Sequence, residues 1–350
     1  MRILCITPIG KVKTPETWFA ELLAKHGHEV TLVFTGYDIS KILLDQEVLN
    51  NEYDVIWGMM EYSIPTAVTY GKLLNIPVYG HIECIPPWRL GIEDNKQWGY
   101  DYPECLGELE RTDAFKKLYK QIMFYFNQCD SRTISGDNWR YTFKALTGTE
   151  VDAKTRYYTF NKDATKQYEN KDIFVHNQIC TISRLIPLKR VHHIIRALAK
   201  IPKERRPIYK LIGYGSEENY LSKLALDLGV VVHFLGDGSN GIKEKTLQES
   251  MFNVQISSGV PILEAGAFKK HTISYDDPHM VEVYGDMCTW VERNNIDALA
   301  KEIDKFASNP ELCKKKGIET YDNMMKLCDT NNFVKTVEGH LERAIKKWKI

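Results

Sequence analysis

Apolar strand-like segments alternate with helical segments along this chain, and the alternation runs through twice. In the first half, strand-like segments at 3–7 and 29–34 flank a helical segment at 15–26. The pattern restarts with a strand-like segment at 179–182, and a helical segment follows it at 191–200. Alternation of this kind builds parallel sheets covered by helices. The chain is therefore predicted to be α/β, with two Rossmann-like, doubly wound parallel-sheet domains.

The boundary between the two halves falls in a polar, charged stretch at 161–176, a composition typical of an interdomain linker. We therefore expect an N-terminal domain at 1–165 and a second domain at 173–330. Apolar residues recur at helical spacing in the tail at 331–350. This tail is expected to form a helix that packs back across the domains.

Composition excludes several classes of protein. Lys plus Arg and Asp plus Glu both number 46, so the net charge is zero and no nucleic-acid partner is expected. No apolar run approaches the roughly 20 residues of a membrane span. The 8 cysteines are scattered without a C-x-x-C pair, and the N-terminus reads as a strand rather than a signal peptide. A cytoplasmic protein with reduced thiols and no metal site is expected.

Residues 179–191 place two cations around the loop that follows a strand. The strand ends at Ser183, Arg184 comes next, and a helix is expected to begin near Lys189. Ligands of open α/β sheets bind beyond the carboxyl ends of the strands. Arg184 and Lys189 can therefore point at one ligand, and two cations at a helix start suit a diphosphate. The alternative is a surface loop with two solvated cations.

Gly213 and Gly215 follow the strand-like segment at 209–212. Glycine lets a backbone turn tightly beside a ligand, which makes both residues candidates for ligand binding. A turn without any ligand is the alternative. A dinucleotide fingerprint would need a third glycine where this chain has Glu218, so a Rossmann dehydrogenase is excluded.

Residues 257–267 read as a glycine loop that leads into a helix with proline near its first position. The free amides of such a helix start can hold a phosphate, so Ser258, Gly259 and Val260 are candidate ligand contacts. Glu264 lies one turn into the helix, where a carboxylate can accept hydrogen bonds from ribose hydroxyls. The alternative is an acid that interacts only with the helix dipole, worth about 0.3–1 kcal/mol.

In order and spacing, these segments resemble the retaining family 4, or group 1, glycosyltransferases, which have the GT-B fold. The matching patterns are R-x4-K at 184–189, L-G-V followed by F-L-G within 228–236, and G-x-P-x-x-E-A-x-A at 259–267. The segment at 209–217 resembles the family's L-x-I-x-G-x-G-x-E, with Tyr209 and Leu211 at the Leu and Ile positions. The resemblance is specific over 179–268 and generic in the first half.

The resemblance implies two domains that face each other across a cleft. It also implies a hexosyltransferase-type enzyme that moves a sugar from a nucleoside-diphosphate sugar to a glycan, a lipid-linked or another hydroxyl acceptor. The anomeric configuration is retained in the family and no metal is required. No cofactor is expected, because the nucleotide sugar is a substrate. A UDP-sugar is the first expectation and a GDP-sugar the second.

The resemblance also assigns roles to residues. Arg184 and Lys189 match the groups that stabilise the leaving diphosphate, and His81 falls near a family histidine at the cleft, as a third catalytic candidate. A buried structural role for His81 is equally open. His233 lies in the segment beside the nucleotide base, with packing as its alternative, and Gly10 lies in the loop that approaches the phosphates.

The chain departs from the family at Ile256, where the usual motif has a second Glu eight positions before Glu264. That missing acid belongs to the region that touches the donor sugar. The departure leaves two alternatives to transfer. One is a nucleotide-sugar 2-epimerase, and the other is a non-catalytic member that binds nucleotide sugar or glycan.

The acceptor is expected to enter through the first domain. Candidate acceptor surfaces are the segment at 86–90 and the polar, aromatic loop at 94–110. The helical segment at 115–126 combines lysines with aromatics, which would suit docking on the cytoplasmic face of a membrane. A buried helix with a solvated lysine edge is the commoner explanation. The oligomeric state stays open.

Overall fold

The computed structural model describes residues 1–8, 15–39, 42, 44–82, 113–155, 177–256 and 259–349. The chain divides into two compact units. Within the described ranges, unit 1 contains the residues up to 155 together with 329–349, and unit 2 contains 177–328. The chain thus passes from unit 1 into unit 2 and returns to unit 1 at its end.

Unit 1 is built on a parallel sheet whose described strands lie in the order β2-β1-β3-β4-β5-β6. The strands are β1 (Arg2–Thr7), β2 (Glu29–Phe34), β3 (Val55–Gly58), β4 (Val78–Ile82), β5 (Ser131–Ser135) and β6 (Ala153–Thr155). The helices are α1 (Pro15–Lys25), α2 (Gln46–Leu49), η1 (Glu61–Ser63), α3 (Ile64–Leu74), α4 (Asp113–Phe126), α5 (Asp137–Thr147) and α13 (Thr330–Trp348). β3 and β4 are buried along their whole length, as expected for central strands covered on both faces.

The tail helix α13 belongs to the core of unit 1. Phe333, Val337 and Leu341 are at most 3% exposed and pack in one cluster with Trp57 of β3. The ring of Phe333 lies 4.7 Å from that of Phe19 on α1. Each such side chain contributes roughly 1.5–3 kcal/mol when it is fully buried, so α13 is an integral element of this unit.

Unit 2 has a second parallel sheet, with described strands in the order β12-β11-β10-β7-β8-β9. The strands are β7 (Gln178–Ile182), β8 (Ile208–Ile212), β9 (Val232–Phe234), β10 (Phe252–Val254), β11 (Thr272–Tyr275) and β12 (Cys288–Val291). The chain starts this sheet at β7, builds outward to β9, and then restarts beside β7 with β10. The order therefore reverses between β7 and β10, and such a switch point is where open α/β sheets bind ligands.

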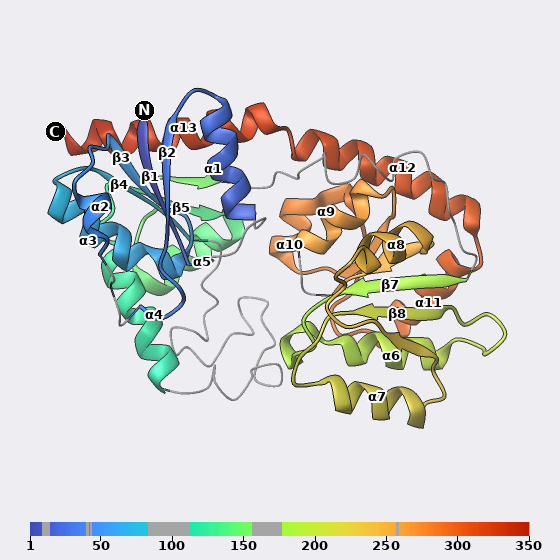
Figure 1. Cartoon of the computed structure of the whole chain (residues 1–350). Helices are drawn as coiled ribbons and strands as arrows, with labels where there is room; N and C mark the ends of the chain where they lie inside the picture. Colours follow the sequence, from blue (N-terminus) through green and yellow to red (C-terminus); the bar gives the residue numbers. More distant parts are fainter. Residues whose placement is uncertain are drawn as a thin grey trace. The chain divides into compact units, whose positions relative to one another are not determined.

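Helices cover both faces of the unit 2 sheet, with α6 and α7 on one side of β7 and β8 and α8 and α9 on the other (Figure 1). The helices are η7 (Pro187–Lys189), α6 (Val191–Lys200), α7 (Glu218–Asp227), α8 (Ile242–Glu249), α9 (Val260–Ala267), α10 (Pro278–Tyr284), η8 (Gly285–Met287), α11 (Ile296–Ala307) and α12 (Pro310–Leu327). The two sheets confirm the predicted α/β class. In the part of the chain described here, no helix has the length and apolar character needed to cross a membrane.

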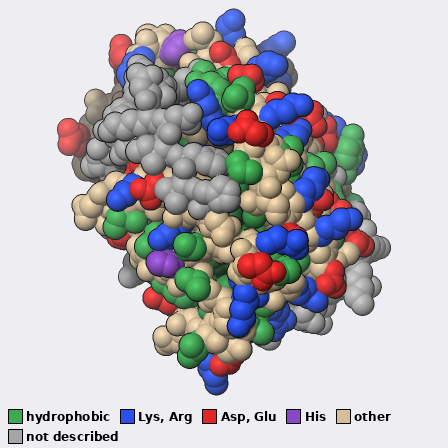
Figure 2. All heavy atoms as spheres, turned by 90° about the vertical axis from the view of Figure 1, so that its right-hand side faces the viewer, with side chains coloured by type: hydrophobic (Ala, Val, Ile, Leu, Met, Phe, Trp, Pro, Cys, Tyr) green, Lys and Arg blue, Asp and Glu red, His purple; other side chains and the backbone are tan. Residues whose placement is uncertain are grey.

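Charged side chains of both signs are interspersed on the face of the molecule shown in Figure 2. This distribution agrees with the equal numbers of acidic and basic residues. An extended single-sign surface, the usual footprint of nucleic-acid binding, is not seen on that face.

Candidate functional site

Three loops meet at the carboxyl edge of the unit 2 sheet, and backbone hydrogen bonds join them. The amide of Ser183 donates to the carbonyl of Ile212 at 2.9 Å, and the amide of Leu185 donates to that of Tyr214 at 2.9 Å. The amide of Gly213 donates to the carbonyl of Gly236 at 2.6 Å. The loops after β7, β8 and β9 therefore form one connected surface at the end where ligands of such sheets bind.

Gly213 and Gly215 are required for this close loop packing. A Cβ at Gly213 would lie 2.8 Å from the carbonyl carbon of Ser183, and one at Gly215 would lie 2.7 Å from that of Leu185. Gly213 also has φ +134, a conformation that other residues rarely adopt. The close packing of the loops thus explains why both positions are glycine. Their direct contact with a ligand stays a prediction.

Arg184 and Lys189 both lie in the loop between β7 and α6, at the carboxyl end of β7. The side chain of Arg184 is exposed directly after the buried Ser183, and within the described part of the chain its guanidinium has no hydrogen-bond or ion-pair partner. Lys189 is partly buried and ends the 3-10 turn η7, since α6 begins only at Val191. α6 coincides with the helical segment predicted at 191–200, and its start lies two residues after Lys189.

Arg190, which the sequence analysis did not single out, separates that turn from α6. It adopts a left-handed backbone conformation with φ 49 and is 4% exposed. Its Nη1 donates to Oδ1 of Asn294 at 2.7 Å, in the loop after β12. A residue in this conformation stays there only when its surroundings hold it, so the Asn294 contact fixes the loop that carries Arg184 and Lys189.

The predicted glycine loop leads into α9 as expected. Gly259 is the N-cap, and a Cβ there would collide with the hydroxyl of Tyr284 and lie 2.9 Å from its Cζ. Val260 is 48% exposed at the first helical position. The amides at this helix start are the kind that bind phosphate oxygens. Ser258 and Gly10, also predicted to contact the donor, lie outside the described residues.

Glu264 forms an ion pair that the sequence analysis did not predict. Its Oε1 lies 2.7 Å from Nζ of Lys243 on α8, and the two side chains are 17% and 32% exposed. Burial lowers the pKa of Lys243, but the Glu264 carboxylate outweighs it and raises the pKa above its ordinary value. Ile256, at the position of the family's other acid, is 3% exposed in the apolar core.

His81 lies in the interior of unit 1. It is 1% exposed, and its Nδ1 lies 2.9 Å from Oγ1 of Thr133 while its Nε2 lies 3.4 Å from Oγ of Ser135. Burial, together with the nearby His340, holds its pKa well below the ordinary value. This environment favours the structural alternative for His81, and the catalytic role stays a prediction.

His233 lies on the exposed side of the edge strand β9. Its Nδ1 is 3.3 Å from Nζ of Lys210 on the neighbouring strand β8. The position at a sheet edge beside the loop of Gly236 agrees with a surface role. Contact with a nucleotide base stays a prediction for this residue.

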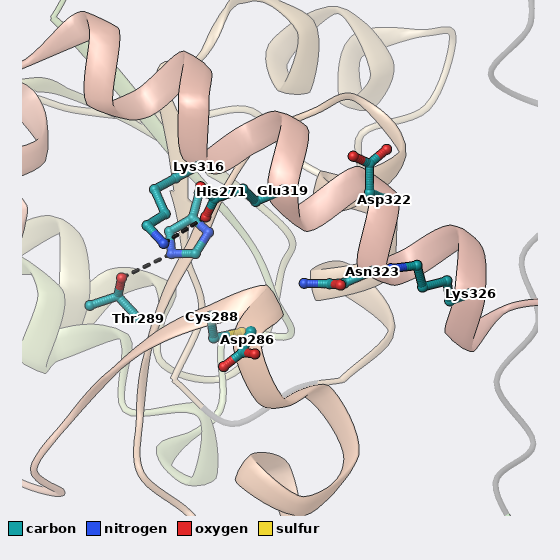
Figure 3. A pocket seen from close by; sticks show the side chains of 9 residues that line it. All are labelled: His271, Asp286, Cys288, Thr289, Lys316, Glu319, Asp322, Asn323 and Lys326. Atoms are coloured by element: carbon teal, nitrogen blue, oxygen red, sulfur yellow. Dashed lines mark hydrogen bonds and ion pairs between the residues drawn. The ribbon is translucent and has the colours of Figure 1, made fainter.

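A separate hollow of about 420 Å³ lies at the amino edge of the same sheet, between α12 and the η8–β12 segment (Figure 3). It is lined by His271, Asp286, Cys288, Thr289, Lys316, Glu319, Asp322, Asn323 and Lys326. Nδ1 of His271 lies 2.7 Å from Oγ1 of Thr320, and its Nε2 lies 2.9 Å from Oγ1 of Thr289. Because His271 precedes β11 and Cys288 opens β12, this hollow lies at the opposite edge from the loops of Arg184 and Glu264.

The described residues contain no group of three or more His, Cys, Asp or Glu side chains arranged to hold a metal ion. The candidate site therefore consists of the exposed Arg184, the partly buried Lys189, a helix start and a carboxylate that is paired with a lysine.

Comparison with known proteins finds similarities to glycosyltransferases. Residues 176–322 match the family of glycosyl transferases group 1. An uncharacterized glycosyltransferase of Methanocaldococcus jannaschii is 24% identical over 337 residues, which cover 83% of each chain. Among solved structures, Anabaena HepE in complex with UDP-glucose superposes with a TM-score of 0.71 at 14% identity, over 98% of this chain and 99% of that one.

Two further structures share the fold. Sucrose-phosphate synthase from Thermosynechococcus elongatus gives a TM-score of 0.69 at 13% identity and covers 97% of both chains. S. aureus TarM, in complex with Fondaparinux, alpha-GlcNAc-glycerol and UDP, gives 0.63 at 19% identity. This chain spans about half the length of TarM, with 82% of its own residues aligned to 55% of TarM.

The two parallel-sheet units and these similarities show that the chain has the GT-B fold. Residues 176–322 match the family model of the group 1 glycosyl transferases, and this similarity is confined to unit 2. The residues of the carboxyl-edge loops, from Arg184 to Glu264, all lie inside this segment.

Proposed function

We propose that this protein transfers a hexose from a nucleoside-diphosphate sugar to a hydroxyl group of a glycan or lipid-linked acceptor, with retained anomeric configuration and without a metal ion. The observation that carries the proposal is the carboxyl edge of the unit 2 sheet. There the exposed Arg184, the start of α9 and Glu264 lie on adjoining loops and helices inside the segment that matches the group 1 family.

The arrangement suits the departure of a nucleoside diphosphate. Negative charge develops on the diphosphate as the bond to the sugar breaks, and groups aimed at that charge lower the barrier. Arg184 and Lys189 supply positive charge from the loop after β7, and the amides after Gly259 supply hydrogen-bond donors. Since Arg184 has no partner among the described residues, it is available to a phosphate.

UDP is the first nucleotide to test. HepE carries UDP-glucose and TarM carries UDP in their structures, and both share the fold of this chain. GDP remains the second choice. In this proposal the nucleotide sugar is a substrate, and no cofactor takes part.

The acceptor is assigned to unit 1, with a lipid-linked hydroxyl at the cytoplasmic face of a membrane as one form. Tyr119, Ile122 and Phe126 of α4 are fully buried. Lys117 and Lys120 are exposed on the helix, and Phe124 is 66% exposed. The buried face of α4 agrees with the alternative of a buried helix with a solvated lysine edge. The exposed lysines and Phe124 support the proposal of peripheral contact with a membrane. The loop at 94–110 lies outside the described residues.

The test is thermal unfolding of the wild type and of Arg184→Ala with UDP, GDP, ADP, CMP and NAD added separately. A ligand at about 100 times its Kd adds roughly 2.7 kcal/mol, which moves the midpoint by several degrees. One nucleoside diphosphate should shift the wild type and not the variant. A product assay with the matching hexose donors, read by NMR of the anomeric proton, then reports transfer and configuration. No shift with any nucleotide would overturn the proposal.

A binding protein without transferase activity is the second candidate, and the burial of Ile256 is the observation that favours it. An apolar side chain fills the position of an acid that touches the donor sugar in the resembled family. Donor binding without turnover across a broad acceptor panel would support this candidate. Product formed without any acceptor would instead indicate a nucleotide-sugar 2-epimerase.

A further inference from the structure

Lys243 is the residue of the carboxyl-edge region that neither the sequence motifs nor the comparisons assign to a role. It lies in the first turn of α8, and its ammonium reaches across to α9, where it contacts Oε1 of Glu264 at 2.7 Å. Both side chains are largely removed from solvent, at 32% and 17% exposure. An ion pair in such a place is screened less than a surface pair.

Backbone contacts hold the main chain of Lys243 in place. The amide of Lys243 donates to the carbonyl of Gly238 at 3.1 Å. A Cβ at Gly238 would lie 3.2 Å from Cβ of Lys243 and 2.7 Å from Cγ2 of Ile212, so the backbone approaches closely there. Gly238 has φ +71, which glycine adopts without strain. Lys243 is therefore anchored to the loop after β9 and to the end of β8.

Glu264 keeps an accepting oxygen while it is paired. An ionised carboxylate has two oxygens and about four lone-pair sites. Lys243 contacts Oε1, and Oε2 has no hydrogen bond or ion pair with any of the described residues. The neighbours of Glu264 along α9, Leu263 and Ala265, are at most 2% exposed and pack inward, so the helix itself is fixed. The ion pair then fixes the remaining freedom of the Glu264 side chain.

We propose that Lys243 is a positioning residue for nucleotide recognition, which holds the Glu264 carboxylate so that its second oxygen accepts hydrogen bonds from the ribose hydroxyls of the donor. The inference rests on the proposed function and deepens it, because it names the group that orients the ribose contact. If the ion pair between Lys243 and Glu264 only held α8 against α9, its loss would lower stability and leave ribose recognition unchanged.

The experiment compares two ligands that differ only in the ribose, UDP and 2′,3′-dideoxy-UDP, by calorimetric titration. The wild type should bind UDP at least about tenfold more tightly, since hydrogen bonds to a charged acceptor are lost in the dideoxy ligand. Glu264→Gln should remove most of this preference. Lys243→Met should weaken UDP binding about tenfold and leave dideoxy-UDP binding within about twofold of wild type.

Three further variants make the comparison specific. Lys245→Met removes a lysine from the same helix whose side chain is 73% exposed and pairs with Glu249, so it should leave both affinities unchanged. Lys243→Arg keeps the charge and should restore the preference for UDP. The double variant Lys243→Met with Glu264→Gln should bind UDP no more weakly than Glu264→Gln alone, because both changes remove the same contact. If Lys243→Met does not fold, Lys243→Gln serves in its place.

The outcomes separate the two proposals. Equal weakening of UDP and dideoxy-UDP in Lys243→Met, or an unchanged preference for UDP, would overturn the positioning role and leave the proposed function intact. A wild type that binds UDP and dideoxy-UDP equally would remove the ribose contact itself. A wild type that binds no nucleoside diphosphate would overturn the proposed function, and the inference with it.

Discussion

The hydroxyl of Tyr284 occupies the space in which a side chain at Gly259 would begin. A Cβ at Gly259 would collide with that hydroxyl and lie 2.9 Å from Cζ of the same ring. Tyr284 ends α10 and is 3% exposed, so it cannot move into solvent without disturbing its neighbours. Tyr284 of α10 therefore packs directly against the start of α9, which is proposed to bind phosphate.

Gly259→Ala is expected to lower both stability and nucleotide affinity. The added methyl group must displace Tyr284 or the first turn of α9, and overpacking of this kind costs about 1–3 kcal/mol. The backbone amides after Gly259 would move with the first turn of α9 and would no longer point toward the proposed phosphate position. Thermal unfolding with and without UDP measures both effects. Combination with Tyr284→Phe removes the colliding hydroxyl and should recover part of the stability, since the ring contacts at 2.9 Å to Cζ and 3.2 Å to Cε2 remain.

Gly339→Ala is the matched control for this change. Gly339 lies in α13, and a Cβ there would have nothing within 4 Å. Alanine favours a helix over glycine by about 1 kcal/mol, so this variant should be as stable as the wild type or more so. If Gly259→Ala behaves like Gly339→Ala, the contact with Tyr284 does not constrain the helix start.

Arg184→Ala and Lys189→Ala should each lower turnover at least about a hundredfold, on the order of 3 kcal/mol for one lost charge contact in the transition state. The Arg184 side chain is exposed, so the melting temperature of that variant should stay close to wild type. The measurement is kcat for transfer from UDP-sugar. Arg196→Ala removes an exposed arginine of α6 whose Nη2 donates to the hydroxyl of Tyr220 at 3.4 Å, and it should keep wild-type turnover. Wild-type rates in both test variants would remove these residues from the site.

The sequence predicts much of the carboxyl edge because its signals are local. The glycines after β8, the cations after β7 and the glycine loop before α9 each lie within a dozen residues of the strand or helix that positions them. Turns between strands and helices prefer particular residues, so a short stretch of sequence is enough to predict them. The predicted α/β class depends on the same local alternation of strands and helices.

The contacts that hold this edge together could not be predicted, since they join residues far apart in sequence. Lys243 and Glu264 are 21 positions apart, and Arg190 and Asn294 are 104 apart. The helix predicted at 191–200 is α6, but the left-handed conformation of Arg190 just before it could not be predicted, since its partner Asn294 lies in a distant loop. β11 and β12 were not predicted, since polar residues interrupt their short apolar runs, Thr272 and Ser274 in β11 and Thr289 in β12.

Gly213→Ala should destabilise unit 2 far more than Gly236→Ala. Both glycines have positive φ, so both alanine variants carry backbone strain of about 1–2 kcal/mol. A Cβ at Gly213 would also collide with the backbone of Ser183, whereas one at Gly236 would have nothing within 4 Å. Chemical denaturation of the two variants gives the comparison. Equal losses of stability would mean that the loops after β7 and β8 can separate without penalty.

The stability of the protein should depend on pH through His271. Burial, and then the nearby Lys316, lower the pKa of this histidine to about 4, and its ring also stacks on Phe306. Glu319 opposes the shift, but the burial effect exceeds it. In the unfolded chain a histidine titrates near pH 6.5. Between these values the unfolded state binds the extra proton, so stability falls as the pH is lowered.

His271→Gln should make this pH dependence shallower. The slope for one proton is about 1.4 kcal/mol per pH unit, and the variant should lose about that much of the slope between pH 6 and pH 4.5. Other buried histidines with lowered pKa values, such as His192 at about 4, contribute to the wild-type slope and remain in the variant. Urea unfolding at several pH values measures both curves, which should run parallel above pH 7.5, where His271 is neutral in both states. Identical slopes at low pH would show that His271 takes up its proton in the folded protein as readily as in the unfolded chain, and that its hydrogen bonds to Thr289 and Thr320 open without loss of stability.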